Sequence, residues 1–211
     1  MGRKEKNEQQ REDIRQMILK EAKNLFLKDG YEATSMRKIA QEAGISPTTI
    51  YLYYKDKSDM AYALHKEGFK ILGKQFMVLQ SVENAFERLK AMGRIYLRFA
   101  LENPDFYEIM FIMKEPIEFL SRQNVCEWEE GEQAFNSLLN TVADCKKEGF
   151  FKGMDERMVA LNIWALVHGL CSLKLQGHLD HVAAAHFGEG MQRDVLEDAY
   201  NGLILMINSL R

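Results

Sequence analysis

The segment from Ser46 to Tyr54 carries residue types that can bind a nucleic acid. Its polar side chains bear hydroxyl groups, and neither lysine nor glutamate occurs among them. Hydroxyl groups hydrogen-bond to phosphates and base edges, while methyl groups contact thymine. A merely solvated helix face is usually rich in lysine and glutamate. We therefore interpret this segment as a DNA-reading face whose contacting residues are Pro47, Thr48, Thr49, Tyr51 and Tyr53.

Such a face must be held by two helices that cross tightly through a short turn. Ala40 is small enough for the close crossing, and Gly44, four residues later, can take the positive φ of the turn. Ile50 supplies the apolar anchor of the second helix, and Ile39 and Ile45 complete a small core. This Ala-x3-Gly-x5-Ile spacing predicts a helix-turn-helix.

The rest of the chain is also predicted to be helical. Apolar residues recur at three- and four-residue spacing, and the 211 residues include only 3 prolines. Ser46 can cap a helix that Pro47 opens. The expected helices cover 14–27, 36–43, 47–53, 57–79, 84–102, 104–113, 123–148, 155–176 and 192–210.

The predicted fold class is all-α: an N-terminal three-helix DNA-binding domain with a helix-turn-helix, and a larger helical domain for ligand binding and dimerisation. Residues 1–10 are expected to form a flexible polar arm, residues 11–56 the DNA-binding domain and residues 57–211 the second domain.

Charge and cysteine content narrow the function classes. The formal net charge of −3 does not by itself indicate nucleic-acid binding, but residues 1–60 carry 12 basic against 10 acidic side chains. Cys126, Cys145 and Cys171 are too widely spaced for a zinc ribbon and are interpreted as buried free thiols. His178 and His181 lack a nearby third ligand, so no metal site is predicted.

Three runs carry a resemblance to a known family. Gly30–Ala40 (GYEATSMRKIA), Ala43–Ser46 (AGIS) and Ile50–Lys57 (IYLYYKDK) resemble the N-terminal signature of the TetR family of transcriptional regulators. The resemblance covers about 45 residues from Ile14. Farther on, Asn103–Tyr107 with Met110-Phe111, and Trp164 with His168-Gly169, are more weakly similar to one subgroup of TetR-like C-terminal domains.

The resemblance implies roles for individual residues. Thr34 and Tyr51 would contact phosphates or base edges, Arg37 would reach DNA from the first helix, and Thr48 and Thr49 would enter the major groove. Lys57 would hold a phosphate at the next helix start. The chain departs from many members in having Tyr53 for His and Tyr54 for Phe. The predicted DNA-contacting set is Thr34, Ser35, Arg37, Ser46, Pro47, Thr48, Thr49, Tyr51, Tyr53, Lys55 and Lys57.

Aromatic and methionine side chains crowd the middle of the sequence. At helical spacing they are first of all core, yet methionine-rich apolar surfaces also line adaptable ligand pockets. His168 can equally be a core histidine, and the acidic run of Glu127, Glu129, Glu130 and Glu132 can be a solvated face or recognise a cation. The predicted ligand contacts are Tyr96, Phe99, Tyr107, Met110, Phe111, Trp128, Trp164 and His168.

The predicted function is a cytoplasmic repressor that leaves its operator when a small, mostly apolar effector binds, with no cofactor and no membrane partner. Its expected partners are a palindromic double-stranded operator and a second copy of the chain. The homodimer is expected through 155–176 and 192–210, because a monomer would expose the stripe Val195, Ala199, Leu203, Met206 and Leu210.

Two alternatives stay open. One is a helical interaction module of TetR-like fold without regulated DNA binding, which would show no salt-sensitive binding to a duplex. The other is an enzyme, for which a Cys145 and His168 pair is conceivable although nothing in their spacing supports it. The predicted answer is that the chain is not an enzyme.

Overall fold

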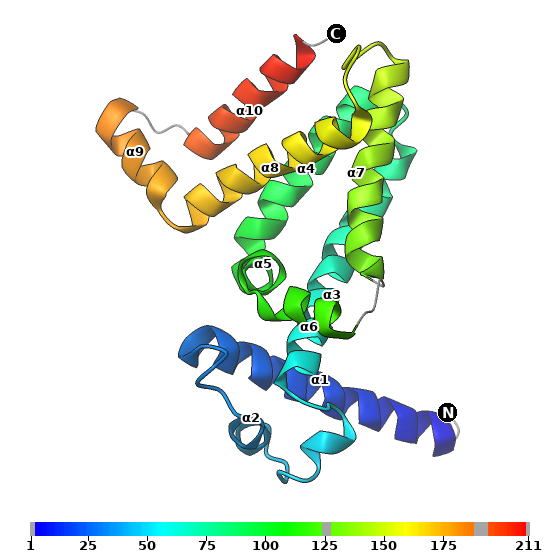
Figure 1. The fold of residues 1–211 in the computed structure, drawn as a ribbon, viewed down its shortest axis with the longest axis vertical. Coiled ribbons are helices and arrows are strands. Elements are labelled where there is room, and N and C mark those ends of the chain that lie inside the picture. The colour runs from blue at the N-terminus through cyan, green and yellow to red at the C-terminus, as the bar shows by residue number, and fades with distance from the viewer. Residues whose placement is uncertain (1–2, 124–127, 188–193, 210–211) are drawn as a thin grey trace. The chain divides into compact units, whose positions relative to one another are not determined.

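Helices form every regular element in the parts of the chain that the structure, a computed structural model, describes: residues 3–123, 128–187 and 194–209 (Figure 1). The all-α prediction is therefore confirmed. The elements are α1 (Arg3–Asp29), α2 (Met36–Glu42), the 3-10 turn η1 (Ile50–Leu52), α3 (Lys57–Met77), the 3-10 turn η2 (Val78–Ser81), α4 (Ala85–Glu102), α5 (Pro104–Tyr107), the π-helical turn η3 (Glu108–Ile112), α6 (Glu115–Gln123), α7 (Glu129–Lys147), α8 (Glu156–Leu175), α9 (His178–Phe187) and α10 (Val195–Asn208).

The chain divides into two compact units. Unit 1 comprises residues 1–69 and 105–128, and unit 2 comprises residues 70–104 and 129–211. The sequence placed the boundary after residue 56, so the division differs from that expectation: the first part of α3 and most of α5 and α6 group with the helix-turn-helix. Tight packing explains part of this, since a Cβ added at Gly68 of α3 would lie 2.3 Å from the sulfur of Met110 in η3.

α1 begins earlier than the sequence suggested. Residues 1–10 were expected to be a flexible arm, but the helix already includes Arg3. The segment is rich in Arg, Lys, Glu and Gln, which favour helix, and Gln9 donates to the Asp13 carboxylate at 2.9 Å, four residues on. Residues 6–13 are all exposed, so local propensity rather than apolar packing within this chain supports this end of the helix.

The core of unit 1 follows the apolar stripe of α1. Ile18, Ala22 and Phe26 are buried, as are Ile39 and Ile50 of the helix-turn-helix. α1 is also fastened to α5: the ammonium of Lys23 forms an ion pair with Asp105 and lies 4.4 Å from the centre of the Phe106 ring. Burial alone would raise the pKa of Asp105, but the hydrogen bond and charge of Lys23 hold it below its ordinary value.

α4, α7 and α8 pack against one another to form the core of unit 2, and α10 packs on α8. Gly93 of α4 allows α10 to approach closely, because an added Cβ would lie 2.3 Å from the hydroxyl oxygen of Tyr200. The same hydroxyl donates to the carbonyl of Lys90 at 2.6 Å, and burial raises the pKa of Tyr200 to about 12.

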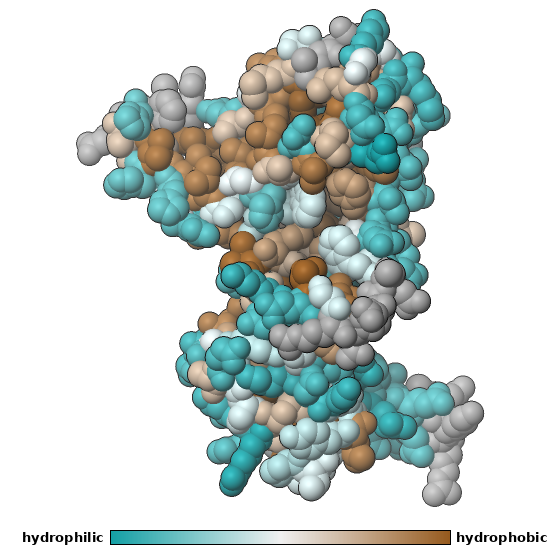
Figure 2. Space-filling model, viewed as in Figure 1, coloured by the Kyte–Doolittle hydropathy of each residue, from teal (hydrophilic) through white to brown (hydrophobic). Residues whose placement is uncertain are grey.

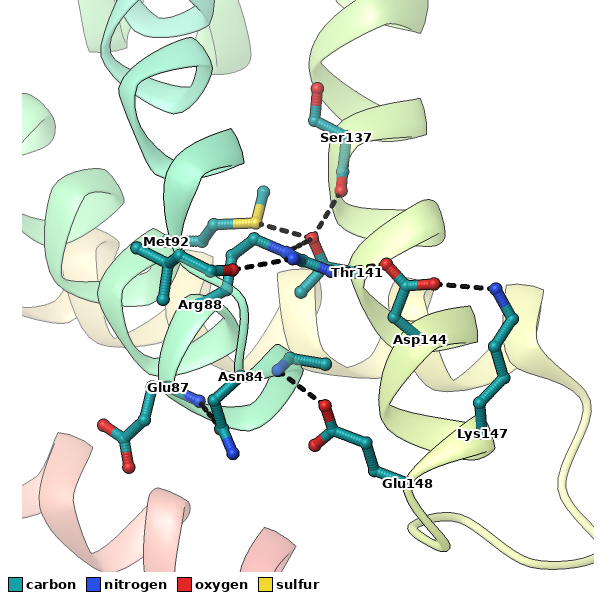
Figure 3. A network of polar contacts seen from close by, with 11 residues as sticks. Asn84, Glu87, Arg88, Met92, Ser137, Thr141, Asp144, Lys147 and Glu148 are labelled. Carbon is teal, nitrogen blue, oxygen red and sulfur yellow. Dashed lines mark hydrogen bonds and ion pairs between the residues drawn. The ribbon is translucent and has the colours of Figure 1, made fainter.

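A polar network joins α4 to α7 beside this core (Figure 3). The Arg88 guanidinium pairs with Asp144, donates to the carbonyl of Val82 at 2.8 Å and reaches the Thr141 hydroxyl at 3.4 Å. The pKa of Asp144 is lowered, mainly by the hydrogen bond from Lys147 and to a smaller extent by the charge and hydrogen bond of Arg88. The amide of Ala85 at the start of α4 donates to the Glu148 carboxylate at 2.9 Å, which satisfies a helix N-terminal donor.

The C-terminal helices differ from the predicted pattern in two respects. Residues 115–123 and 178–187 form α6 and α9, for which no helices were placed. Within the predicted 123–148 helix, α7 covers Glu129–Lys147, and residues 124–127 lie outside the described residues. On α10 the residues buried within the chain are Leu196, Tyr200, Leu203 and Ile207, whereas the predicted stripe was the one that a monomer would expose. Of the predicted residues Leu203 is buried, Met206 is 61% exposed and Leu210 lies outside the described residues.

Exposed apolar side chains gather on the C-terminal helices. In Figure 2 the apolar surface is concentrated over the part of unit 2 that holds α8, α9 and α10, whereas α1 is mostly hydrophilic. α8 is long and apolar enough to cross a membrane by length and composition, a test that the core helix of a soluble protein also passes. The large apolar side chains that are exposed on α8 and α10 are Met158, Leu161, Leu166, Leu173, Leu205 and Met206.

Candidate functional site

α2 ends in a Schellman motif, which forms the turn to the following segment. Gly44 has φ of +66°, its amide donates to the Gln41 carbonyl at 3.1 Å, and the Ile45 amide donates to the Ala40 carbonyl at 3.0 Å. These two bonds satisfy carbonyls that the end of α2 would leave free. Residues with a side chain rarely adopt this φ. The glycine therefore allows the backbone turn that sets the direction in which the next segment leaves α2.

The segment after the turn is tighter than the α-helix predicted from 47 to 53. Only Ile50–Leu52 forms a helical element, the 3-10 turn η1, and the Thr49 and Tyr53 amides donate to the carbonyls three residues earlier. Ser46 makes the capping contact that the sequence predicted: its Oγ accepts from the Thr49 amide at 3.0 Å and contacts the Thr48 and Thr49 hydroxyls.

This segment presents an uncharged, exposed face. Ser46, Pro47 and Thr48 are exposed, and Tyr51 and Leu52 are 58% and 74% exposed, while Ile50 is fully buried beneath them. Leu52 was missed by the sequence reasoning. Its place two residues from the Ile50 anchor was the available signal, since that spacing points away from the core.

Thr34 is a correction to the predicted DNA-contacting set. It is only 2% exposed, and its hydroxyl donates to the carbonyl of Gly30 at 2.8 Å. The hydroxyl therefore ties the end of α1 to the turn that follows. Ser35 is also engaged within the chain, because its Oγ caps α2 by accepting from the Lys38 amide at 3.1 Å, whereas Arg37 is exposed.

Lys57 contacts the protein at the start of α3. Its ammonium donates to the Tyr31 carbonyl at 2.7 Å and lies 4.3 Å from the centre of the Tyr31 ring. Burial raises the pKa of Tyr31, whose hydroxyl is 3.0 Å from that of Ser58. These contacts connect α3 to the loop before α2. The phosphate contact of Lys57 stays a prediction, as does the DNA contact of the exposed Lys55.

Three predicted ligand contacts meet in unit 2. The Trp164 indole donates to the Tyr96 hydroxyl at 3.2 Å, and that hydroxyl lies 3.0 Å from Nδ1 of His168. The indole can only donate, so the Tyr96 oxygen accepts from it, and the tautomer of His168 decides which group donates in the second contact. Burial lowers the pKa of His168, which favours the neutral imidazole. Phe99 is fully buried in α4, as a core residue would be.

The other four predicted ligand contacts lie in unit 1. Phe69 links Phe111 and Trp128 by edge-to-face contacts with ring centres 5.4 Å apart, and Tyr107 contacts Phe111 at 5.3 Å. Met110 packs against Gly68. The sequence reasoning missed the α3 rings of this region, Tyr62, His65 and Phe69, although positions 62, 65 and 69 share one helix face.

Two of the three thiols are buried in the described part of the chain. Cys145 and Cys171 are free and buried, and burial raises the pKa of each to about 12. A thiol with such a pKa stays protonated near neutral pH, so it lacks the thiolate that nucleophilic catalysis requires. Cys126 lies outside the described residues.

Comparison with known families gives two matches. Residues 18–64 match the family described as bacterial regulatory proteins, tetR family, and residues 89–194 match the tetracyclin repressor-like C-terminal domain. HTH-type transcriptional regulators of Staphylococcus aureus are 32% identical over 90 residues, or 42% of this chain and 49% of theirs. The chain thus spans about half the length of the curated relatives it matches.

Solved structures share the fold. FadR of Bacillus subtilis, in complex with stearoyl-CoA, is 18% identical with a TM-score of 0.71 and covers 93% of this chain and 99% of its own. The fatty acid degradation regulator FadR of Bacillus halodurans is 19% identical with a TM-score of 0.68 over 90% and 94% of the two chains. At these identities the likeness concerns the fold alone.

Proposed function

Because the chain belongs to the tetR family of bacterial regulatory proteins, we propose that it is a ligand-responsive transcriptional repressor that binds DNA. The observation that carries the proposal is the exposed, uncharged face of residues 46–52, held by the Schellman turn at Gly44. Hydroxyl and apolar side chains on a fixed element suit the reading of base edges and thymine methyls. A repressor of this kind works in the cytoplasm, where its operator lies.

The active species is a homodimer. The apolar side chains exposed on α8 and α10 are a large surface for a single soluble chain, and a second copy would cover them. Two reading faces related by a two-fold axis require a palindromic operator with half-sites about 34–36 Å apart. The second copy therefore sets which DNA the first can bind.

The effector is a small, mostly apolar molecule. α3 is the natural transmitter, since it starts beside the helix-turn-helix at Lys57 and continues through both units. A molecule that favours the non-binding state by roughly 3 kcal/mol lowers operator affinity more than about a hundredfold. Stearoyl-CoA, the molecule in the Bacillus subtilis FadR structure, is one candidate to include in a ligand panel.

The test starts from purified full-length protein and a random duplex pool. Rounds of selection should enrich a palindromic sequence, which is then footprinted and titrated at several salt concentrations. Binding should weaken steeply with salt, and some apolar compounds of the panel should release the duplex. Enrichment of no sequence would contradict DNA reading, whereas a bound operator that no compound releases would contradict the ligand response.

The matched control uses two leucines of different position. Leu52→Ala should prevent enrichment of the same sequence, because the side chain lies on the reading face. Leu27→Ala on α1, at 39% exposure, should enrich the wild-type sequence. If both variants enriched it equally, residues 46–52 would not be the reading face.

A further inference from the structure

Six aromatic rings of unit 1 form a continuous cluster around α3. Tyr62 stacks on Phe119 with ring centres 5.1 Å apart, and His65 contacts Phe69 at 4.9 Å. The cluster, called the α3 ring cluster below, consists of Tyr62, His65, Phe69, Phe111, Phe119 and Trp128.

The cluster combines buried rings with partly accessible ones. His65 and Phe69 are 1% and 4% exposed, whereas Tyr62, Phe119 and Trp128 keep part of their surface accessible. Ring planes meet both edge to face, at 83° between Phe69 and Trp128, and nearly parallel, at 27° between Tyr62 and Phe119. The rings thus already pack by both faces and edges, and the accessible parts of Tyr62, Phe119 and Trp128 can extend this packing to an aromatic molecule.

The indole nitrogen of Trp128 distinguishes this cluster from a simple apolar core. The nitrogen is buried, and no hydrogen-bond acceptor reaches it among the described residues. A buried donor without an acceptor is costly, and such groups usually have a protein, water or ligand partner. An indole N–H can only donate, so the missing partner must be an acceptor.

The other tryptophan provides the contrast. The Trp164 indole already donates to Tyr96 within unit 2. The chain contains only these 2 tryptophans. Of the two tryptophans, only Trp128 therefore lacks an acceptor among the described residues. For this reason we expect the polar contact with the effector in the α3 ring cluster and not at Trp164 and His168.

We propose that the α3 ring cluster binds an aromatic effector that carries an oxygen acceptor, such as an aryl ketone, and that Trp128 Nε1–H donates to this oxygen. This inference rests on the proposed ligand response and names its ligand class. Ring surfaces favour a flat aromatic molecule over a bare aliphatic chain. A simple cation is a poorer fit despite the rings, because it brings no acceptor to the indole.

The experiment compares two probes of nearly the same shape. Benzophenone has a carbonyl where 1,1-diphenylethylene has a methylene group, so only the ketone can accept the indole proton. Calorimetry with the full-length protein, without DNA, should give the ketone an affinity about three- to tenfold higher, as one net hydrogen bond provides. Trp128→Phe should remove this preference and leave alkene affinity within about twofold.

Trp164→Phe is the matched control and should keep the preference for the ketone. It also leaves Trp128 as the sole indole, so its N–H resonance can be followed by NMR if Trp128→Phe fails to fold. The ketone should move that resonance downfield, and the alkene should not. Equal affinities in the wild type, no binding of either probe, or a preference lost in Trp164→Phe would each overturn the proposal. Since none of these measurements involves DNA, their failure is distinct from failure of operator binding.

Discussion

The helix-turn-helix and the C-terminal helices expose their side chains for different reasons. Between Ala40 and Leu52, neighbouring residues fix the backbone through the Gly44 turn and the Ser46 hydroxyl, and polar groups dominate the exposed face. On α8 and α10 the exposed face is apolar and has no covering element among the described residues. The first region is held within one chain, whereas for the second we propose that another copy of the chain covers it. Mutations can test this difference directly.

The largest effect is expected from a charge placed on the apolar face of α8. Leu161→Glu, at a position 44% exposed, should convert the dimer to a monomer, because burying an unpaired carboxylate is prohibitive. Loss of the second reading face should lower operator affinity more than about a hundredfold. Sedimentation and gel-shift titration measure the two effects. Ile117→Glu in α6, at 46% exposure, is the control and should stay dimeric; a monomer there, or a dimeric Leu161→Glu, contradicts the assignment.

The next effect concerns the reading face. Tyr51→Ala should weaken operator binding about ten- to a hundredfold, equivalent to roughly 1–3 kcal/mol for a base or phosphate contact, while binding to random duplex changes little. Tyr51 is 58% exposed, so the unfolding temperature should stay close to that of the wild type. Parallel titrations with operator and random duplex measure the ratio. An equal loss on both duplexes would give Tyr51 a phosphate role without sequence information.

Two glycines in helix interiors should respond with opposite signs. Gly93→Ala should lower the free energy of unfolding by about 1–3 kcal/mol, because its Cβ would collide with the Tyr200 ring and hydroxyl. Gly73→Ala in α3 meets nothing within 4 Å and should raise it by about 0.5–1 kcal/mol through helix propensity. Urea denaturation of both variants provides the measurement. A stabilising Gly93→Ala would mean that α10 does not pack closely on α4.

The smallest effect is a change in pH dependence. Burial lowers the pKa of His168 below the ordinary 6.5, so the unfolded chain binds the proton more tightly than the folded one. The stability that neutral His168 contributes is present above about pH 6.5 and is lost as the pH falls through the range below it. His168→Gln should therefore lose less stability on acidification, by denaturation at pH 7 and 5.5. His178→Gln, at an exposed site, should follow the wild type; an unchanged slope in His168→Gln would contradict the assignment.

The sequence by itself determined the features that depend on near neighbours. Ala40, Gly44 and Ile50 specify the turn because all three act within eleven residues, and their spacing was readable without any partner. The helical character of the chain and the positions of α4, α8 and α10 also followed from local periodicity to within a few residues. This spacing lies within residues 18–64, which match the tetR family of bacterial regulatory proteins, so the resemblance seen in the sequence and the family match agree.

Only the tertiary structure decided which side chains the helices bury. The sequence placed Thr34 among the DNA-contacting residues, yet its hydroxyl is buried and donates to the Gly30 carbonyl at the end of α1. Leu203 was expected on the stripe of α10 that a monomer would expose, yet it is buried. The packing of this helix depends on distant residues, since the close approach of Tyr200 requires Gly93, more than a hundred residues away. Likewise, two tryptophans identical in type differ because Tyr96 accepts from one and no described residue accepts from the other. Periodicity reports only the residues along one helix, whereas burial and hydrogen bonding depend on which distant elements pack against it.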